Sequence, residues 1–355
     1  MTPGDATRQF ERLANAALDL ATLPDQLLEA LARVVRFDSY TWAAIDPRSL
    51  LPTGKMGTTI PFPSSLILEE QEQIARGIEP GDLRSMARTG RSVALLSEIV
   101  GDRKEQSLIY RRILRPNGLE HQLRCTLALD GAHWGQLHIE RRPHRPDFTP
   151  SEVTLVQALV PHLVHALRRW LIADPGITGN ATSPALPGVI VFCEDNEVDS
   201  ISPEAEHWLS EWGVSDLGRP PIAISAAVAA ARARADGYSD SIPSVRLRLK
   251  TGTWLHVRAT HLARPDRKVR TAVLLERGSA EQVAPLVARA NQLTARETDI
   301  AMLVLRGLST SEIAATVFIS PYTVQDHLKS IFEKVGVRSR RQLATEIFET
   351  HYPAA

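Results

Sequence analysis

The feature that most limits how this chain can fold is a series of helix start signals between residues 293 and 348. Thr294-Ala295-Arg296-Glu297 is a capping box, in which the Thr hydroxyl and the Glu side chain each satisfy a free backbone N–H. Gly307 and Gly336 stand where a left-handed residue would end the first and third helices. The other start signals are Ser309-Thr310-Ser311-Glu312, Ser320-Pro321 and Ser339-Arg340-Arg341-Gln342. We therefore expect four short helices in this segment.

The third of these helices is expected to bury one face and expose the other. Its apolar residues recur at the spacing i, i+4, i+7 and i+11, which directs them toward the other helices. These residues are Val324, Leu328, Ile331 and Val335. The opposite side then carries Tyr322, Asp326, Lys329 and Glu333, with Gln325 on its flank.

The tight link Val317-Phe318-Ile319 between the second and third helices is typical of a helix-turn-helix, whose second helix enters the major groove of DNA. The residues around the link resemble the LuxR-type (GerE-like) DNA-binding domain. The resemblance rests on Leu293-Thr294-x-Arg296-Glu297, Gly307 to Ala314, Ile319-Ser320-Pro321-Tyr322-Thr323-Val324-x-x-His327-Leu328 and Lys334-Val335-Gly336-Val337-x-Ser339-Arg340. It implies a bacterial transcription regulator that binds double-stranded DNA.

The resemblance also implies roles for single residues of the third helix. In the family, the positions that match Gln325, Asp326 and Lys329 reach base edges. Gln can pair with adenine, Asp can accept from cytosine, and Lys can donate to guanine or to phosphate. The family usually has Lys where this chain has Gln325, so a target sequence cannot be borrowed from another member. The alternative for Asp326 and Glu333 is an intrahelical ion pair with Lys329.

A second set of residues is expected near the DNA backbone. From Asn291 to the end, seven Lys and Arg residues balance seven Asp and Glu residues, and five of these cations lie between Lys329 and Arg341. Because counterion release scales with the number of phosphates neutralised, one copy should bind weakly, and a homodimer on a two-fold site would remedy this. The resemblance implies that Ser320, Tyr322, Thr323 and Arg338 lie near the backbone, and the expected backbone set also includes Arg340 and Arg341.

Residues 1–173 are expected to form an α+β domain. The pattern predicts helices within residues 6–35, a strand at 37–45, helices at 64–76 and 104–114, and a hairpin at Asp130-Gly131. Thr149-Pro150-Ser151-Glu152 caps a long exit helix that ends near Ile172.

This order of elements resembles a GAF-type sensory domain, which holds a small molecule in a pocket on its sheet. The resemblance also rests on Phe37-Asp38-x-x-x-Trp42 and Trp134-Gly135-x-Leu137. The alternative for each pocket residue is ordinary packing in the core. The candidate ligand pocket consists of Tyr40, Trp42, Cys125, Trp134 and His138.

The remaining segments complete a multidomain chain. Residues 174–187 are rich in Pro, Gly, Ser and Thr and are expected to be a linker. Residues 188–278 show two strands, a helix start at Pro203, an Ala-rich helix near 221–235 and three strands. This α+β order is similar to a small PAS domain with a scaffold or dimerisation role. Residues 279–292 would be a connecting helix, and residues 293–355 the all-α helix-turn-helix domain.

Composition excludes several other classes of protein. The 355 residues carry no net charge, and the two cysteines lie in different expected domains, which favours reduced thiols in the cytoplasm. The sequence has no uncharged run of transmembrane length. It lacks a nucleophile elbow, a phosphate loop and metal-ligand spacing; the pair His162 and His165 has no third partner. We therefore expect neither an enzyme nor a metal or cofactor site.

The sequence thus predicts a cytoplasmic DNA-binding transcription regulator. Its N-terminal domains would control it through a small-molecule ligand and dimerisation. One alternative is a regulator whose N-terminal domains bind a partner protein rather than a metabolite. A remote alternative is an enzyme with an appended DNA-binding tail.

Overall fold

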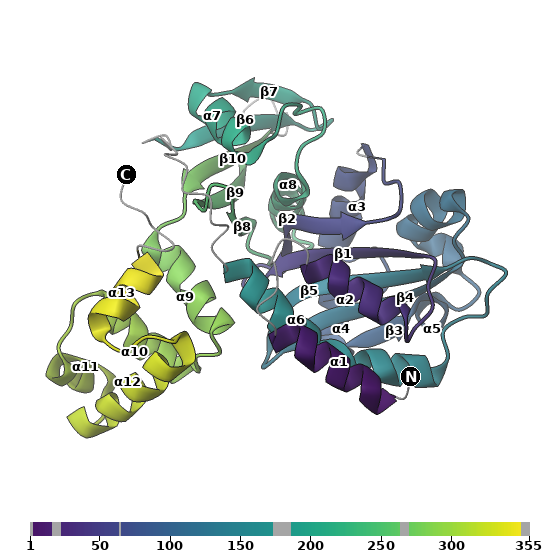
Figure 1. The fold of residues 1–355 in the computed structure, drawn as a ribbon. Helices are drawn as coiled ribbons and strands as arrows, with labels where there is room; N and C mark the ends of the chain where they lie inside the picture. Colours follow the sequence, from purple (N-terminus) through teal and green to yellow (C-terminus); the bar gives the residue numbers. More distant parts are fainter. Residues whose placement is uncertain (1–2, 16–22, 64, 173–185, 263–269, 349–355) are drawn as a thin grey trace. The chain divides into compact units, whose positions relative to one another are not determined.

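The computed structural model describes residues 3–15, 23–63, 65–172, 186–262 and 270–348. The chain forms two compact units. The first comprises Met1–Trp170, Leu186–Leu247 and His256–Glu276, and the second comprises Leu171–Ala185, Arg248–Leu255 and Arg277–Ala355. An α+β region therefore precedes a C-terminal all-α domain (Figure 1). Of the expected linker, only Leu186 and Pro187 lie within the described residues.

The first unit contains a five-stranded sheet in the order β2-β1-β5-β4-β3. Its hairpin between β4 and β5 turns at Asp130 and Gly131, whose φ angles of 53° and 71° are those of the turn expected from Asp-Gly. The paired strands are antiparallel. They are β1 (Ser39–Asp46), β2 (Leu51–Thr58), β3 (Val93–Leu95), β4 (His121–Leu129) and β5 (Ala132–Arg141).

Helices lie on both faces of this first sheet. α2 (Leu23–Ala32) and α6 (Pro150–Ile172) cover one face, and α1 (Pro3–Asn15) packs beside α2 (Figure 1). α3 (Ser65–Ala75) and α4 (Leu83–Thr89) lie against the opposite face, and α5 (Leu96–Val100) follows β3. The long exit helix starts at the predicted capping box, since the Thr149 N–H donates to Glu152 Oε2 at 2.8 Å.

The prediction of one helix at residues 104–114 is wrong. The structure has a 3-10 turn at Lys104–Gln106, a π-helical turn at Tyr110–Leu114 and a second 3-10 turn at Arg115–Asn117. Ser107 has an extended backbone with φ −79° and ψ 123°, which interrupts the expected helix after its first turn. Pro116 has no N–H and its ring would clash with the carbonyl four residues earlier, so it limits only the last turn. The apolar periodicity predicted helical backbone but not its irregular pitch.

The second five-stranded sheet has the order β7-β6-β10-β9-β8. Its strands are β6 (Gly188–Cys193), β7 (Val198–Ile201), β8 (Ser244–Arg248), β9 (Trp254–Leu262) and β10 (Arg270–Arg277). The expected two-strand, helix, three-strand order is confirmed, and the helix expected to start at Pro203 is α7 (Pro203–Trp212), which Ser202 caps.

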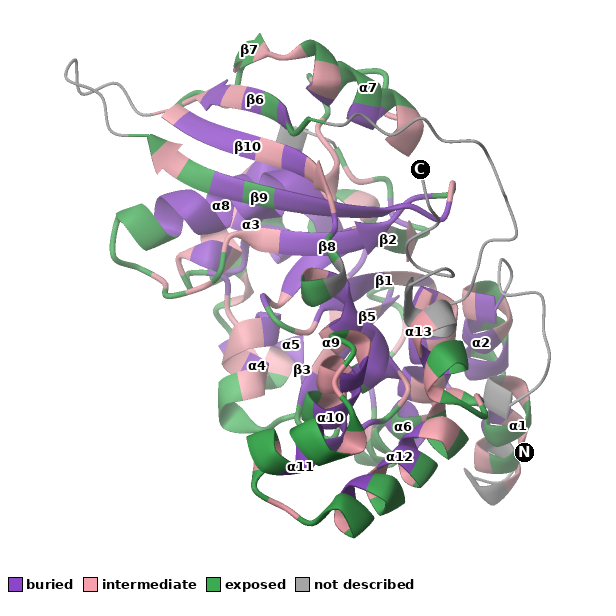
Figure 2. Cartoon of the chain, turned by 90° about the vertical axis from the view of Figure 1, so that its left-hand side faces the viewer, coloured by how far each residue is buried: buried purple, intermediate pink, exposed green. Residues whose placement is uncertain are grey.

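The Ala-rich helix α8 (Ile222–Ala235) joins the two sheets of the first unit. It is buried along almost its whole length because it packs against α3 and β2 (Figure 2). Arg232 of α8 donates to Glu72 of α3 at 2.8 Å and to the carbonyl of Cys193 at 2.6 Å. A buried ion pair between Arg246 of β8 and Asp46 of β1, at 2.5 Å, adds a second tie.

The C-terminal helices pack as the sequence predicted. α12 contacts α10 and α11, and α9 contacts α10 and α13. Their common core includes Ile300, Ile313, Val324, Leu328 and Leu343, all of which are buried. The five helices are α9 (Ala280–Ala290), α10 (Ala295–Leu305), α11 (Thr310–Val317), α12 (Pro321–Val335) and α13 (Arg340–Phe348).

Candidate nucleic-acid interface

The predicted caps fix the starts of the helices in this domain. In the first box, Thr294 Oγ1 accepts from the Glu297 N–H at 3.2 Å, and the Thr294 N–H donates to Glu297 Oε2 at 2.7 Å. The second box, at Ser309 and Glu312, has the same two hydrogen bonds. The third box is only half formed, because Gln342 Oε1 accepts from the Arg338 N–H instead of the expected Ser339 N–H. The last contact ties the turn before α13 to that helix.

Glu297 does more than cap α10. Its Oε1 accepts from Ser330 Oγ at 2.6 Å, and its Oε2 accepts from Lys334 Nζ at 2.6 Å; both partners lie on α12. Burial alone would raise the pKa of this carboxyl, but hydrogen bonds from Lys334, Ser330 and Thr294 outweigh it and lower the pKa to about 2. One ionised side chain therefore joins α10 to α12.

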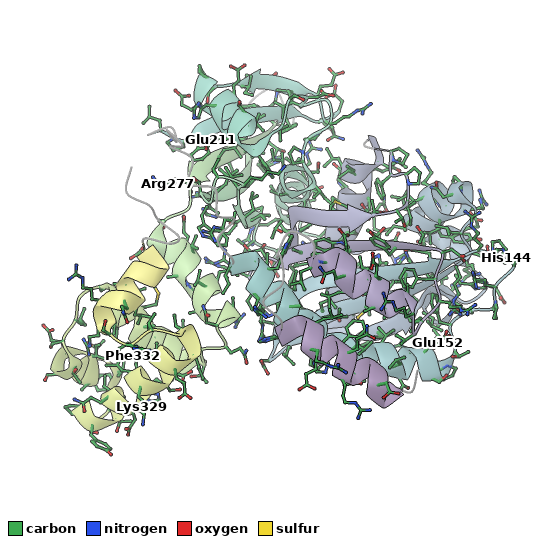
Figure 3. The ribbon with its side chains drawn as sticks, viewed as in Figure 1. His144, Glu152, Glu211, Arg277, Lys329 and Phe332 are labelled. Atoms are coloured by element: carbon green, nitrogen blue, oxygen red, sulfur yellow. The ribbon has the colours of Figure 1, made fainter. Side chains whose placement is uncertain are left out.

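The exposed face of α12 is the one that the sequence predicted. Val324, Leu328 and Ile331 are buried against the other helices. Lys329 lies on the solvent side of the helix (Figure 3), and no ion pair joins it to Asp326 or Glu333 among the described residues of α12. The exposed side chains are Tyr322, Gln325, Asp326, Lys329 and Glu333. The three residues expected to read bases thus share an open surface.

The residues expected near the DNA backbone divide into two groups. Ser320 and Thr323 meet at the start of α12, with their hydroxyl oxygens 2.8 Å apart, while Tyr322 is exposed beside them. Arg338 and Arg341 are also exposed. By contrast, the guanidinium of Arg340 donates within the domain, to the Leu308 carbonyl and to Thr310 Oγ1, both at 2.8 Å. Arg340 thus braces the turn between α10 and α11.

The turn before α12 holds a residue whose conformation the sequence did not reveal. Phe318 adopts a left-handed backbone with φ 57° and ψ 45°, and 92% of its surface is exposed. Non-glycine residues rarely adopt this conformation, so Phe gave no signal for it. The guanidinium of Arg296 donates to the carbonyl of Val317 and thereby supports the same turn.

The five residues of the candidate ligand pocket do not share one cavity. Trp42 and Cys125 are both paired with Leu137, so they lie on the face toward α6, and Tyr40 follows the same alternation. His138 is the next residue along β5 and lies on the opposite face. Trp134 is the unpaired residue of a β-bulge, which brings its ring to 4.9 Å from Arg168 of α6. The sheet therefore separates His138 from the other four.

Two cavities flank this sheet. The first, of about 50 Å³, is lined by Trp42, Trp170 and leucines of α2 and α6. The second, of about 40 Å³, lies on the face toward α3 and α4 and is lined by His138 together with several charged residues. Sequence reasoning missed those charged residues, because an alternating strand such as Gln122-Leu-Arg-Cys normally directs its polar side chains to solvent.

Two further observations concern the described part of the chain. Its residues form no group of three or more His, Cys, Asp or Glu that could hold a metal ion. None of its helices combines the length and the apolar character needed to cross a membrane.

Comparison with known proteins finds similarity mainly in the C-terminal helices. Residues 291–347 match the family described as bacterial regulatory proteins, luxR family. The spore germination protein GerE of Bacillus subtilis is 38% identical over 55 residues, which cover 16% of this chain and 74% of that protein. A putative HTH-type transcriptional regulator of Mycobacterium bovis is 44% identical over 72 residues, which cover 20% of this chain but 8% of that relative.

Solved structures give a weaker likeness that extends over the whole chain. Escherichia coli SdiA aligns with 99% of this chain and 99% of its own, at 14% identity and a TM-score of 0.36.

Proposed function

This chain belongs to the luxR family of bacterial regulatory proteins, and from that premise we propose that it is a sequence-specific DNA-binding transcription regulator. The observation that carries the proposal is the exposed face of α12, which presents Gln325, Asp326 and Lys329 on a helix held in place by Glu297. A rigid helix with polar side chains on its open face fits the width of the DNA major groove.

We infer a distinct role for each part of this face. Gln325 would pair with adenine, Asp326 would accept from the amino group of cytosine, and Lys329 would donate to guanine or to a phosphate. The hydroxyls of Ser320 and Thr323 lie at the start of α12, where the helix dipole favours a phosphate. The remaining backbone contacts would come from Tyr322, Arg338 and Arg341. Arg340 would instead stabilise the turn between α10 and α11 through its hydrogen bonds within the domain.

Binding to a two-fold DNA site as a homodimer follows from the charge of the domain. Its equal numbers of cations and anions give one copy a weak attraction to DNA. Two copies on one site double the number of phosphate contacts, and their spacing adds specificity.

We assign control of DNA binding to the N-terminal domains. Residues 1–173 would be a GAF-like sensory domain, residues 174–187 a linker, and residues 188–278 a PAS-like domain. A connecting helix at 279–292 would lead to the DNA-binding domain at 293–355. A small molecule that binds one sensory state better would shift the population able to bind DNA in the cytoplasm.

Selection from random duplex DNA with the full chain tests this proposal. We expect a two-fold motif, and Gln325→Ala should relax the preference at one symmetric pair of base positions. Asp299→Ala changes an exposed acid of α10 and serves as the control, which should leave the motif unchanged. If the wild-type chain enriched no motif, or if Gln325→Ala selected an unaltered one, the assignment of α12 as the reader would fail.

A further inference from the structure

We propose that the cavity between α3, α4 and the first sheet is a binding site for a small oxyanion, which Arg84 holds by its guanidinium and which helix α8 closes. This Arg84 cavity deepens the proposed function, since it supplies the site and the ligand chemistry for the sensory step. The lining residues used below are Glu70, Arg84, Arg124, Gln136, His138 and Ala226.

The unsatisfied group of the cavity is the guanidinium of Arg84 on α4. Both of its terminal nitrogens, Nη1 and Nη2, are buried and have no hydrogen-bond partner among the described residues. Burial lowers the pKa of this side chain, but a guanidinium remains protonated in proteins. A buried charge without a partner is costly, and a carboxylate or phosphate is the group that matches the guanidinium fork.

The other ions of the cavity already have partners. Arg124 donates to Glu79 Oε1 at 3.1 Å, to Gln122 Oε1 at 2.8 Å and to the Pro80 carbonyl. Glu79 also accepts from Ser107 Oγ at 2.6 Å. Asp82 Oδ1 accepts from the Ser85 N–H at the start of α4. Asp82 acts on Arg84 through space, but within the described residues no carboxylate accepts a hydrogen bond from the terminal nitrogens of Arg84, so a bound anion can fill that place.

The same cavity is lined by further groups that can hydrogen-bond to an anion. Burial holds His138 neutral by lowering its pKa to about 3. Burial also raises the pKa of Glu70 to about 7, which populates its protonated, hydrogen-donating form. Gln136 adds an uncharged amide. These groups can bind the remainder of a ligand whose charged end lies at Arg84.

The size of the cavity limits the ligand. Its volume is about 40 Å³, and one water needs roughly 10–15 Å³ on the same measure. The space therefore suits a ligand of only a few heavy atoms, such as a short-chain carboxylate or inorganic phosphate.

The cavity is incomplete without the second sheet's helix α8. Ala226 of α8 lines the cavity. Helix α3, which also lines the cavity, packs against α8. These ties are the ion pair between Glu72 and Arg232 at 2.8 Å and that between Arg76 and Asp236 at 3.0 Å. A ligand at Arg84 thus stabilises α3, α4 and α8 together, and the effect reaches both sheets of the first unit.

Hydrogen exchange of the full chain, followed by mass spectrometry, tests the site with sodium acetate and with inorganic phosphate as probes. Sodium chloride at the same ionic strength is the reference. With a probe at about ten times its Kd, we expect exchange in α3, α4 and α8 to slow about tenfold. Protection by acetate alone identifies the ligand group as a carboxylate, and protection by phosphate alone identifies it as a phosphate.

Three variants separate this site from surface binding of anions. Arg84→Met keeps the side-chain volume and should abolish the protection, whereas Arg84→Lys keeps the charge and should only weaken it. Arg88→Met removes an exposed cation from the same helix and should leave the protection intact. Protection that survives Arg84→Met, that is lost in Arg88→Met, or that is absent from the wild type with both probes would overturn the proposal.

DNA binding by the same samples keeps this test distinct from that of the proposed function. If the wild type binds its DNA motif but shows no protection with either anion, the cavity proposal fails and the regulator remains. If α3, α4 and α8 are protected but no DNA motif is selected, the cavity stands and the proposed function fails.

Discussion

Glu297 should be one of the main supports of the DNA-binding face, and Glu297→Gln tests this. The side chain is 6% exposed and accepts hydrogen bonds from Lys334, Ser330 and Thr294. Its pKa is lowered from 4.5 to about 2. Since a tenfold change in ionisation corresponds to about 1.4 kcal/mol, the ionised form contributes roughly 3 kcal/mol to stability. Lys334 is partly exposed, so solvent screening reduces this to about 2 kcal/mol.

Hydrogen exchange in the intact chain measures this contribution locally. Glu297→Gln keeps the shape of the side chain and removes its charge, so the opening free energy of α10 and α12 should fall by about 2 kcal/mol at pH 7. Their amides should then exchange about 30-fold faster. The control is Glu312→Gln, because Glu312 has the same place in the second capping box but makes no side-chain hydrogen bond or ion pair to α12 within the described residues. Its effect should be smaller and confined to α11.

The stability contribution of Glu297 should depend on pH in a definite direction. The folded pKa of Glu297 lies below the unfolded value, so its contribution is fully present above about pH 4.5 and is lost as the pH falls toward 2. The difference between wild type and Glu297→Gln should therefore be largest at pH 7 and should shrink by about half or more at pH 3. Equal exchange rates at pH 7, or a difference that persists unchanged at pH 3, would refute the assigned role.

The remaining predictions concern other contacts. Lys329→Ala should weaken specific DNA binding by about 1–3 kcal/mol in an anisotropy titration, and unchanged affinity would remove Lys329 from the interface. Phe318→Gly should stabilise the turn before α12 by about 1 kcal/mol, seen as slower exchange there, because glycine adopts the left-handed conformation without strain; faster exchange would contradict this. Asp46→Asn should cost about 3–5 kcal/mol in urea unfolding followed by Trp fluorescence, since Arg246 stays buried and loses its carboxylate partner; a loss under about 1 kcal/mol would rule that out. The plot of log K against log salt should have a slope of about −5 for two copies on one site, and a slope near −12 would mean that all the cations of the domain contact phosphate.

The C-terminal domain was largely predictable because its signals are local. A cap such as Thr294 is recognised from a residue three positions away, and the apolar face of α12 from spacings within one helix. The contacts of Glu297 with Ser330 and Lys334 span 33 and 37 residues, so a local sequence pattern cannot predict them. The sequence therefore predicted which face of α12 is exposed but not what holds the helix in place.

The N-terminal region was harder to predict because its first sheet is buried on both faces. Alternation in β4 separates Arg124 from Cys125, and in a sheet with one wet face Arg124 would point to solvent. Here α3 and α4 cover that face, and Arg124 is only 1% exposed. The bulge at Trp134 then reverses the alternation that would have placed this ring with His138. Because of these two features, residue type alone could not predict which side chains share a pocket.

The distribution of charge in the DNA-binding domain argues for two copies on one site. Arg296, Arg340 and Lys334 donate to groups within the domain, and Arg306 lies 3.6 Å from Glu281 of α9. Three of the seven cations thus donate within the domain, and Arg306 is in a solvent-exposed pair with Glu281. The exposed cations that form no ion pair within the described residues are Lys329, Arg338 and Arg341. Three phosphate contacts give a slope of roughly −3 and a weak complex, whereas six give roughly −5. The internal contacts of Arg296, Lys334 and Arg340 hold the helices of the domain together. In the proposed homodimer, the second copy would add the phosphate contacts that one copy lacks.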